Sequence, residues 1–308
     1  MTDRSKVSSK KTIVIKDLKK YFGQTKAVDG ISIETFKGEI VGFLGPNGAG
    51  KTTAINCMMD FLRPDSGSIK IFGKDSHESS SYLKDKVGFL PGEIKLYDDW
   101  TGFEHLDLSA KIRNITIDGG VNIAKELDLD ISKKVRTLSS GNKQKLGITL
   151  SLAHEPEILI WDEPTNGLDP LLQHKIYDMI YKYANKGHTV FFSSHNLAEV
   201  EKVCDRAYII RQGKIVAEEK ISELKKKKLY KVNVFFDKIP QSEQLIAPNV
   251  SVDKDLPNGY EITVKGDIST LIKKLAEHKI VDMEIIHSSL EDIFLEFYKN
   301  DTTDTKNN

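Results

Sequence analysis

The feature that most constrains this 308-residue chain is a glycine-rich loop between an apolar run and a helical pattern. Residues 39–44 (EIVGFL) form a nearly continuous apolar run, which is typical of a buried parallel strand. Residues 52–62 place apolar side chains at helical spacing, and the turn-forming residues 63–67 (RPDSG) follow them. This order of strand, loop and helix predicts an α/β fold with the loop at a helix N-terminus.

The loop has the composition that phosphate binding requires. It comprises, in order, Gly45, Pro46, Asn47, Gly48, Ala49, Gly50, Lys51 and Thr52, and Thr53 follows it. This fits the P-loop or Walker A pattern, in which glycines let backbone N–H groups surround an anion at the positive end of a helix dipole. We expect residues 45–53 to bind ATP, with Lys51 at the β- and γ-phosphates and the Thr52 hydroxyl on Mg²⁺. A chance match occurs in roughly one or two chains per hundred of this length, but the flanking strand and helix make chance a weak explanation.

A second apolar run ends in two acidic residues. Residues 158–161 (ILIW) read as a buried strand, and Asp162 and Glu163 follow at its C-terminal end, where open α/β sheets place ligands. Asp162 is expected to hold Mg²⁺ through water, and Glu163 is a candidate to polarise the attacking water. Alone, this pattern more often marks a simple strand end. In one domain with the glycine-rich loop, it predicts ATP hydrolysis.

A segment between these motifs resembles the signature motif of the ATP-binding cassette (ABC) ATPases, which is usually written LSGGQ. The segment is Leu138-Ser139-Ser140-Gly141-Asn142, and by itself it predicts only a serine-capped helix start. The resemblance extends in order over residues 12–220. Its other matches are Phe22, with Tyr21 as a neighbouring possibility, for the aromatic residue that stacks on adenine, Gly167-Leu168-Asp169 for the D-loop, and His195 for the switch histidine.

The resemblance implies a mechanism that the local patterns do not supply. In this family two cassettes dimerise head to tail, so Ser139 and the Gly141 backbone are expected to contact the γ-phosphate held by a second copy. Asp169 joins the nucleotide-binding residues through its match to the D-loop. His195 is expected to contact the γ-phosphate and to orient Glu163, which with Lys51 completes the catalytic set. Without the family match, a lone histidine is more often structural.

Two parts of the chain depart from the family pattern. Ser140 and Asn142 replace the second glycine and the glutamine of the signature motif. The glutamine that normally senses Mg²⁺ and links the site to the membrane subunit is expected within residues 87–93 (VGFLPGE), where the matching position is Gly92. Either the neighbouring Glu93 takes over, or sensing relies on backbone and water. Gly92 itself is not assigned as a ligand.

The order of strands, helices and polar segments divides the chain into two domains and two tails. Residues 12–224 are predicted to form the nucleotide-binding domain, an ABC ATPase core with a mixed β-sheet and a helical subdomain at about residues 92–150. Residues 225–300 are predicted to form a small α/β domain that resembles a ferredoxin-like βαββαβ unit with an added helix. The polar residues 1–11 and 301–308 are predicted to be disordered.

Composition limits the function classes and the location. Lys+Arg and Asp+Glu are both 45, so the chain lacks the basic footprint of a nucleic-acid-binding protein. The two cysteines, Cys57 and Cys204, suit a reducing cytosol better than a disulfide framework. No window approaches the roughly 20 apolar residues that cross a bilayer. We therefore expect a cytoplasmic protein that is peripheral on the inner face of the cell membrane.

Three hypotheses follow from the resemblance. Residues 289–295 (SLEDIFL) are similar to the ends of ATPase subunits of bacterial drug, antibiotic and glycoconjugate exporters. The leading hypothesis is a homodimeric transport ATPase of an exporter, which drives a separate integral membrane permease; it is motivated by a single complete cassette without a membrane segment. The alternative is a cassette ATPase that regulates ribosomes or another macromolecular complex, although such proteins usually carry two cassettes or a long coiled coil. The third is a cassette that binds ATP and hydrolyses it poorly, which Gly92 and Asn142 suggest.

Overall fold

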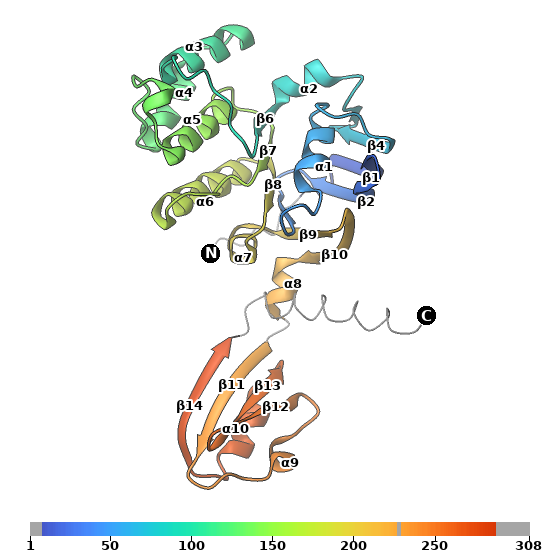
Figure 1. The fold of residues 1–308 in the computed structure, drawn as a ribbon, viewed down its shortest axis with the longest axis vertical. Helices are drawn as coiled ribbons and strands as arrows, with labels where there is room; N and C mark the ends of the chain where they lie inside the picture. Colours follow the sequence, from blue (N-terminus) through green and yellow to red (C-terminus); the bar gives the residue numbers. More distant parts are fainter. Residues whose placement is uncertain (1–7, 227–228, 288–308) are drawn as a thin grey trace. The chain divides into compact units, whose positions relative to one another are not determined.

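The computed structural model describes residues 8–226 and 229–287. These residues fall into two compact units that divide between Glu219 and Lys220 (Figure 1). Each unit has its own sheets and its own buried core. The predicted α/β architecture is confirmed, and each unit is described separately below.

A six-stranded sheet forms the centre of the first unit, in the order β10-β9-β3-β8-β7-β6 (Figure 1). β3 pairs in parallel with β8 and β9, and β7 pairs in parallel with β6 and β8. The carboxyl ends of these strands therefore meet at one edge of the sheet. Every residue of β3, β7 and β8 is buried, as their apolar runs predict. The strands are β3 (Ile40–Leu44), β6 (Val87–Leu90), β7 (Ile158–Asp162), β8 (Thr189–Ser194), β9 (Arg206–Arg211) and β10 (Lys214–Lys220).

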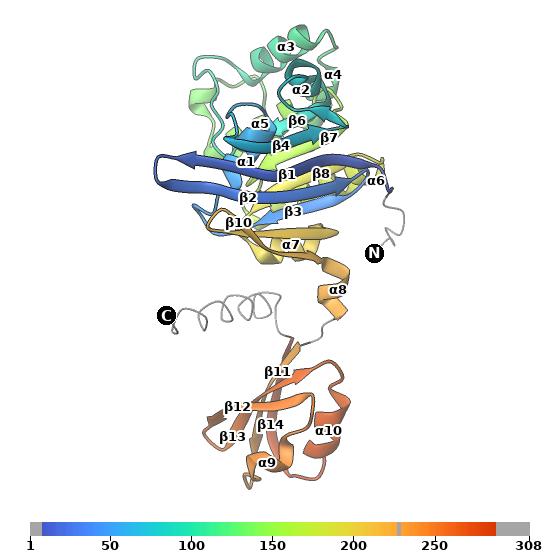
Figure 2. The same ribbon diagram turned by 90° about the vertical axis from the view of Figure 1, so that its right-hand side faces the viewer.

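A second, four-stranded sheet of the first unit has the order β2-β1-β4-β5, and all its pairings are antiparallel. Figure 2 shows its two long strands, β1 and β2, beside the central sheet. Helix α1 (Lys51–Met58) packs between the sheets, and its buried Ala54, Ile55 and Met58 share one core with residues of both. The strands are β1 (Lys11–Phe22), β2 (Thr25–Phe36), β4 (Ser66–Ile71) and β5 (Lys74–Asp75).

Two helices cover the opposite face of the central sheet, namely α6 (Pro170–Asn185) and α7 (Leu197–Val203). Along β3, Val41 and Phe43 point into the core around α1, whereas Gly42 faces α7. A Cβ at Gly42 would lie 2.8 Å from Cys204 Sγ, so glycine at this position lets α7 approach the sheet closely. This close packing fixes the loop between β8 and α7.

Helices gather in the segment predicted to be a helical subdomain. Figure 1 shows α3, α4 and α5 side by side, and their core includes Ala124, Leu138 and Leu146. The predicted capping box is confirmed at α3, where Thr101 and Glu104 bond each other's backbone N–H groups. The helices of this part of the chain are α2 (Ser80–Lys86), α3 (Gly102–Arg113), α4 (Asp118–Glu126), the 3₁₀ helix η1 (Val135–Thr137) and α5 (Ser140–Leu152).

The second unit has the predicted βαββαβ order. Its sheet runs β12-β13-β11-β14, and the described pairings are antiparallel. Leu245 of α9 and Leu271 and Leu275 of α10 pack on one face of this sheet. The elements are α8 (Ile221–Lys226), β11 (Leu229–Phe236), α9 (Ser242–Leu245), β12 (Val250–Leu256), β13 (Gly259–Lys265), α10 (Ser269–Leu275) and β14 (Ile280–His287).

The structure corrects several boundaries. The predicted helix over residues 52–62 ends at Met58, because Asp60 adopts a left-handed φ of 56° and the backbone N–H of Phe61 turns back to Asn56. β4 begins inside the segment interpreted as a turn, and the short β6 was not predicted. The tail predicted over residues 1–11 is too long, because β1 begins at Lys11 and the Lys10 carbonyl accepts from Lys37. The predicted last helix and C-terminal tail lie outside the described residues.

A buried arginine links the two sheets of the first unit. Arg206 on β9 forms a two-pronged ion pair with Glu39, with distances of 2.8 Å from Nε to Oε1 and 2.9 Å from Nη2 to Oε2. Arg206 also donates to the Glu34 backbone carbonyl on β2 at 2.8 Å and to the Tyr208 hydroxyl at 3.0 Å. Burial opposes the charge of Arg206, but the bonds to Glu39 outweigh it and raise the pKa of the guanidinium. The Arg206 guanidinium therefore stays charged in the folded protein.

Replacing Arg206 is predicted to destabilise the first unit strongly. Arg206→Met leaves the Glu39 carboxylate buried without its cation, so the free energy of unfolding should fall by about 3–5 kcal/mol. Adding Glu39→Gln should recover part of this loss. The matched control is Lys182→Met, which breaks an exposed ion pair of 2.8 Å with Glu126 and should cost no more than about 1 kcal/mol. Urea unfolding followed by tryptophan fluorescence measures the free energy of unfolding of the first unit, because both tryptophans, Trp100 and Trp161, lie in that unit. Equal effects of the two single variants would contradict the prediction.

Candidate active site

The candidate site lies where parallel strands of the central sheet end. The glycine-rich loop follows β3, Asp162 ends β7 with Glu163 after it, and His195 follows β8. Strand register brings them together, because Leu44 pairs with Ser194 and Asp162 pairs with Ser193. Motifs far apart in the sequence therefore meet at one edge of the sheet.

The glycine-rich loop turns tightly into helix α1. Gly50 is the N-cap of α1 with a φ of 109°, a conformation that side chains other than glycine rarely adopt. A Cβ at Gly50 would also lie 2.2 Å from the Ala27 carbonyl oxygen. The loop is closed by the backbone bond from Ala49 N–H to the Pro46 carbonyl at 3.2 Å. The first turn of α1 thus presents its backbone N–H groups and the positive end of its dipole at the loop.

Lys51 is a buried cation inside this loop, with 5% of its surface exposed. Its Nζ donates to the carbonyl oxygens of Gly45 at 2.7 Å and Pro46 at 3.1 Å, and it lies 3.3 Å from Glu163 Oε1. Glu163 sits in the left-handed region with a φ of 48°, which costs about 1–2 kcal/mol for a residue with a side chain. The Glu163 backbone N–H donates to the Ser193 hydroxyl at 2.9 Å and helps to hold this conformation.

Thr52 and Asp162 supply oxygen atoms of the kind that Mg²⁺ prefers. The Thr52 hydroxyl donates to Asp162 Oδ2 at 2.7 Å, and the Ser193 hydroxyl donates to Asp162 Oδ1. A single carboxylate beside a hydroxyl suits Mg²⁺, which keeps several waters and shares its remaining ligands with substrate phosphates. Among the residues that the structure describes, no group of three or more His, Cys, Asp or Glu could hold a metal ion. The donor set therefore fits a magnesium ion that arrives with a nucleotide.

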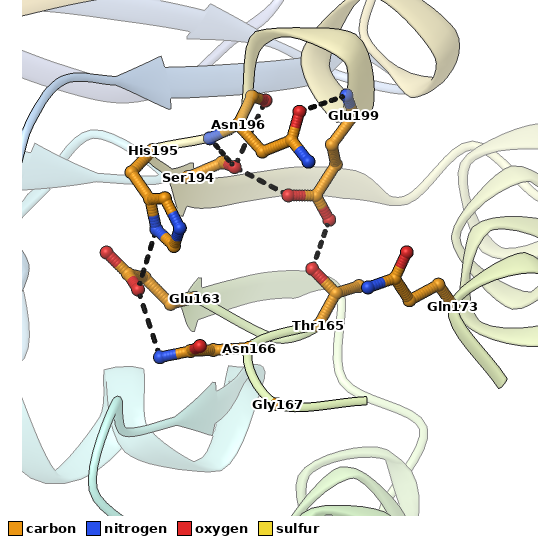
Figure 3. Close-up of a pocket in the computed structure, with 9 residues that line it drawn as sticks. All are labelled: Glu163, Thr165, Asn166, Gly167, Gln173, Ser194, His195, Asn196 and Glu199. Atoms are coloured by element: carbon orange, nitrogen blue, oxygen red, sulfur yellow. Dashed lines mark hydrogen bonds and ion pairs between the residues drawn. The ribbon is translucent and has the colours of Figure 1, made fainter. Parts of the chain in front are cut away.

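His195 and Asn166 hold the second oxygen of Glu163. Figure 3 shows both side chains pointing at Glu163 Oε2, with His195 Nδ1 at 3.1 Å and Asn166 Nδ2 at 3.3 Å. An ionised carboxylate only accepts hydrogen bonds, so this geometry places a proton on Nδ1 of His195. Glu163 is thus contacted by Lys51 through one oxygen and by His195 and Asn166 through the other.

A cleft of about 510 Å³ lies beside the loop, within the size range of small-molecule sites. Phe22 is not among its lining residues; it ends β1, two residues before the lining residue Gln24, and is 49% exposed. Tyr21 is held away by its hydroxyl, which donates to Asp29 at 2.6 Å; this bond raises the pKa of Tyr21 and lowers that of Asp29. The cleft is lined by Gln24, Thr25, Lys26, Ala27, Asn47, Gly48, Gly50, Lys51, Thr52, Thr53, Glu163 and Gln212.

The predicted nucleotide-binding residues at the starts of two other helices do not line this cleft. Ser139 is the N-cap of α5, and its hydroxyl accepts from the Asn142 N–H at 3.3 Å. Gly141 lies in the first turn of the same helix. Asp169 is the N-cap of α6 and accepts from the Leu172 N–H at 3.0 Å. Ser139 and Asp169 are exposed, so these two helix starts are open at the surface of the chain.

The segment with the missing glutamine also reaches the site. A Cβ at Gly92 would lie 3.0 Å from Asp162 Oδ2, so the backbone at this position borders the Asp162 carboxylate. The Glu93 side chain is 84% exposed, and its Oε2 lies 3.9 Å from Lys95 Nζ. In this structure the Glu93 carboxylate therefore lies near Lys95 and is open to solvent.

The sequence patterns did not single out several residues of the site. Ser193 anchors both Asp162 and the Glu163 backbone, and Asn166 bonds Glu163. The signal for Ser193 was the change from apolar to polar residues at the end of residues 190–193. The cleft residues Gln24, Thr25 and Lys26 belong to the start of β2 and its preceding turn, which no motif marks.

Comparisons with known proteins agree with this geometry. The sequence profile described as ABC transporter matches residues 28–166. The bacitracin transport ATP-binding protein BcrA of Enterococcus faecalis is 39% identical over 220 residues, which are 70% of this chain and 71% of that protein. The Nod factor export ATP-binding protein I of Ralstonia nicotianae is 29% identical over 304 residues, which are 94% of each protein. A solved ATP-binding subunit of an ABC transporter has a TM-score of 0.65 at 28% identity, over 70% of this chain and 92% of that one.

The predicted resemblance to the ABC ATPases is thereby confirmed, together with the fold that it implies. Within the described ranges, no helix is long and apolar enough to cross a membrane. The relatives match over most of this chain and of their own length, and the glycine-rich loop lies within the profile match. The chain belongs to the family of ATP-binding proteins of ABC transporters.

Proposed function

We propose that this chain is the ATP-hydrolysing subunit of an exporter, in which two copies drive a separate integral membrane permease. The observation that carries the proposal is the buried Lys51 at the N-terminus of α1, 3.3 Å from Glu163 and next to the Thr52–Asp162 pair. One cation, one hydroxyl–carboxylate pair that suits Mg²⁺ and a second carboxylate that can accept a proton are the groups that phosphoryl transfer to water needs. The names of the two relatives, which state bacitracin transport and Nod factor export, support a role in transport.

ATP binding exchanges partners within the site. The β- and γ-phosphates lie against the N–H groups of the glycine-rich loop and against Lys51, which gives up its contact with Glu163. The Thr52 hydroxyl and the Asp162 carboxylate would hold the Mg²⁺ that accompanies ATP, and the ion would neutralise charge on the phosphates. The internal contacts of these side chains are thus exchanged for contacts to the ligand. The free protein thus keeps its catalytic groups paired until the nucleotide arrives.

Glu163 then serves as the base for water. Released from Lys51, its carboxylate accepts a proton from a water molecule, while His195 and Asn166 hold the other oxygen in place. The water oxygen bonds to the γ-phosphorus as the bond from that phosphorus to the β–γ bridging oxygen breaks. The products are ADP and inorganic phosphate, and Lys51 stabilises the charge on the transferring group.

A second copy completes the cage around the nucleotide. The start of α5, capped by Ser139, is exposed and does not line the cleft of its own chain. Its N–H groups and dipole form an anion site that suits the γ-phosphate bound by a partner molecule. ATP binding therefore closes a head-to-tail homodimer, and hydrolysis reopens it. We propose that this motion acts on the permease from the cytoplasmic face of the membrane.

Removing the lysine charge is predicted to abolish nucleotide binding and turnover. Lys51→Ala deletes charge-assisted bonds to the phosphates, so ATP affinity should fall by at least about tenfold and hydrolysis should drop to background. Titration with a fluorescent ATP analogue and a phosphate-release assay measure the two effects. Lys182→Ala, at an exposed position on α6, is the matched control and should match the parent. Parent-like binding and turnover in Lys51→Ala would refute the proposed site.

Replacing the proposed base is predicted to trap the closed dimer. Glu163→Gln keeps the shape of the side chain but cannot accept the proton, so hydrolysis should fall by about 10²-fold or more while ATP still binds. Size-exclusion chromatography with light scattering should show a dimer of this variant with Mg-ATP and a monomer with ADP. The double variant Glu163→Gln/Lys51→Ala should remain monomeric. A monomer of Glu163→Gln at saturating Mg-ATP would contradict the dimer mechanism.

The permease partner is predicted to co-purify with the ATP-trapped protein. Tagged Glu163→Gln, purified from detergent-solubilised cells of the native host with Mg-ATP, should retain an integral membrane protein with about six spanning segments of roughly 20 residues each. The Lys51→Ala variant is the control, because it cannot close around ATP. Recovery of ribosomes without a membrane protein would instead favour the regulatory class of cassette ATPases.

A further inference from the structure

A buried carboxylate next to the catalytic residues is left without a role by the reaction described above. Glu199 of α7 is 4% exposed and lines a polar cavity of about 150 Å³ that also borders Glu163 and His195 (Figure 3). It is not among the residues of the nucleotide cleft. A buried carboxylate is costly unless it is well paired, so its contacts call for a physical explanation.

Both oxygens of Glu199 accept hydrogen bonds, and the two donors come from different loops. The Thr165 hydroxyl donates to Oε1 at 2.7 Å, and the Ser194 hydroxyl donates to Oε2 at 2.5 Å. Thr165 is two residues after Glu163, in the loop from β7 to α6. Ser194 directly precedes His195, in the loop from β8 to α7. Glu199 therefore joins the loop of the proposed base to the loop of the histidine that contacts it.

The contacts of Ser194 favour Glu199 as the acceptor of its hydroxyl proton. The Ser194 oxygen accepts from the Asn196 backbone N–H at 2.9 Å, and Glu199 Oε2 at 2.5 Å is closer to it than the Asn196 carbonyl oxygen at 3.3 Å. The Asn196 side chain in turn caps α7, with Oδ1 2.9 Å from the Ala198 N–H. Figure 3 shows this chain of bonds running from Thr165 through Glu199 to the loop of His195. The link is continuous from one loop to the other.

The bonds of Glu199 come from hydroxyl groups, and its surroundings disfavour its charge. Burial raises the pKa of Glu199, and the hydroxyl donors of Ser194 and Thr165 partly offset the increase. The nearby negative charge of Glu163 adds to it, whereas His195 opposes it. The bonds that Glu199 accepts from two hydroxyl groups are not ion pairs, so they are not expected to stabilise the fold as an ion pair would. Their geometry points instead to a role in linking the two loops.

We propose that Glu199 is a positioning residue that keeps His195 against Glu163 by tying Ser194 to Thr165. The proposal rests on the proposed function, because it assigns Glu163 and His195 to ATP hydrolysis. The contact it maintains is the 3.1 Å distance between His195 Nδ1 and Glu163 Oε2. Glu199 does not touch the nucleotide, so it acts on turnover and leaves ATP binding unchanged.

Two substitutions of Glu199 by residues of similar size distinguish the effect of its hydrogen bonds to the two loops from the effect of its negative charge. Glu199→Gln removes the charge but can accept at its oxygen and donate from its nitrogen to the other hydroxyl, so both loops remain joined. Glu199→Met fills the space without hydrogen bonds and leaves both hydroxyl groups unsatisfied. Glu201→Met, two residues further along α7, is the matched control on the same helix.

The expected result is a loss in kcat without a change in KM. Glu199→Met should lower kcat for ATP by about tenfold, which corresponds to about 1.4 kcal/mol of transition-state stabilisation, with KM within about twofold of the parent. Glu199→Gln should restore most of the parent rate. In a His195→Ala background, Glu199→Met should lower kcat no further, because the contact it maintains is already absent.

The same measurements separate failure of this inference from failure of the proposed function. Steady-state phosphate release is measured for each variant, with thermal unfolding to compare stability. If Glu163→Gln and His195→Ala keep the parent kcat, the proposed function itself is wrong. If those variants lose activity while Glu199→Met keeps the parent kcat, the linking role is wrong. An additive loss in the His195→Ala background, or a parallel rise in KM, would overturn it in favour of a merely structural role.

Discussion

A cation buried at the positive end of a helix is the constraint on which the site depends. Lys51 is 5% exposed, and both the first turn of α1 and the ammonium group favour an anion at this point. In the free protein Glu163 supplies that anion at 3.3 Å. A triphosphate brings more negative charge and more acceptor oxygens than one carboxylate, so on the proposed mechanism it displaces Glu163 from Lys51. In that mechanism, ATP binding and the release of the proposed base are one electrostatic event.

The parallel sheet makes this exchange possible, because it delivers every partner to one edge with fixed register. Asp162 lies opposite Ser193, whose hydroxyl bonds the Asp162 carboxylate and accepts from the Glu163 N–H. Close packing of α7 on Gly42 sets the position of the next loop, which carries His195. The Glu163 backbone can stay in a left-handed conformation because it directly follows β7 and its N–H donates to the Ser193 hydroxyl.

Local sequence patterns predicted the parts of the site that are formed by residues close together in the sequence. They missed the parts that form only when strands pair and bring distant loops together. The glycine spacing around Lys51 and the acids after residues 158–161 were sufficient to predict the meeting of Lys51, Thr52, Asp162 and Glu163. The sequence could not reveal that Glu199 joins Thr165 to Ser194, because that contact requires two loops brought together by β7 and β8. The early end of α1 was missed for a similar reason, since residues 59–62 keep an apolar spacing although Asp60 turns the chain.

The free chain therefore holds two half-sites that face different surroundings. The cleft beside α1 has the cation and the proposed base, whereas the starts of α5 and α6, capped by Ser139 and Asp169, are exposed outside it. Neither half alone surrounds a γ-phosphate, so on the proposed mechanism closure and catalysis cannot be separated. The loop that holds Glu163 continues directly into the Asp169 cap of α6. A second copy that docks at Asp169 would press on the same loop that Glu199 ties to His195, which joins assembly of the dimer to alignment of the base.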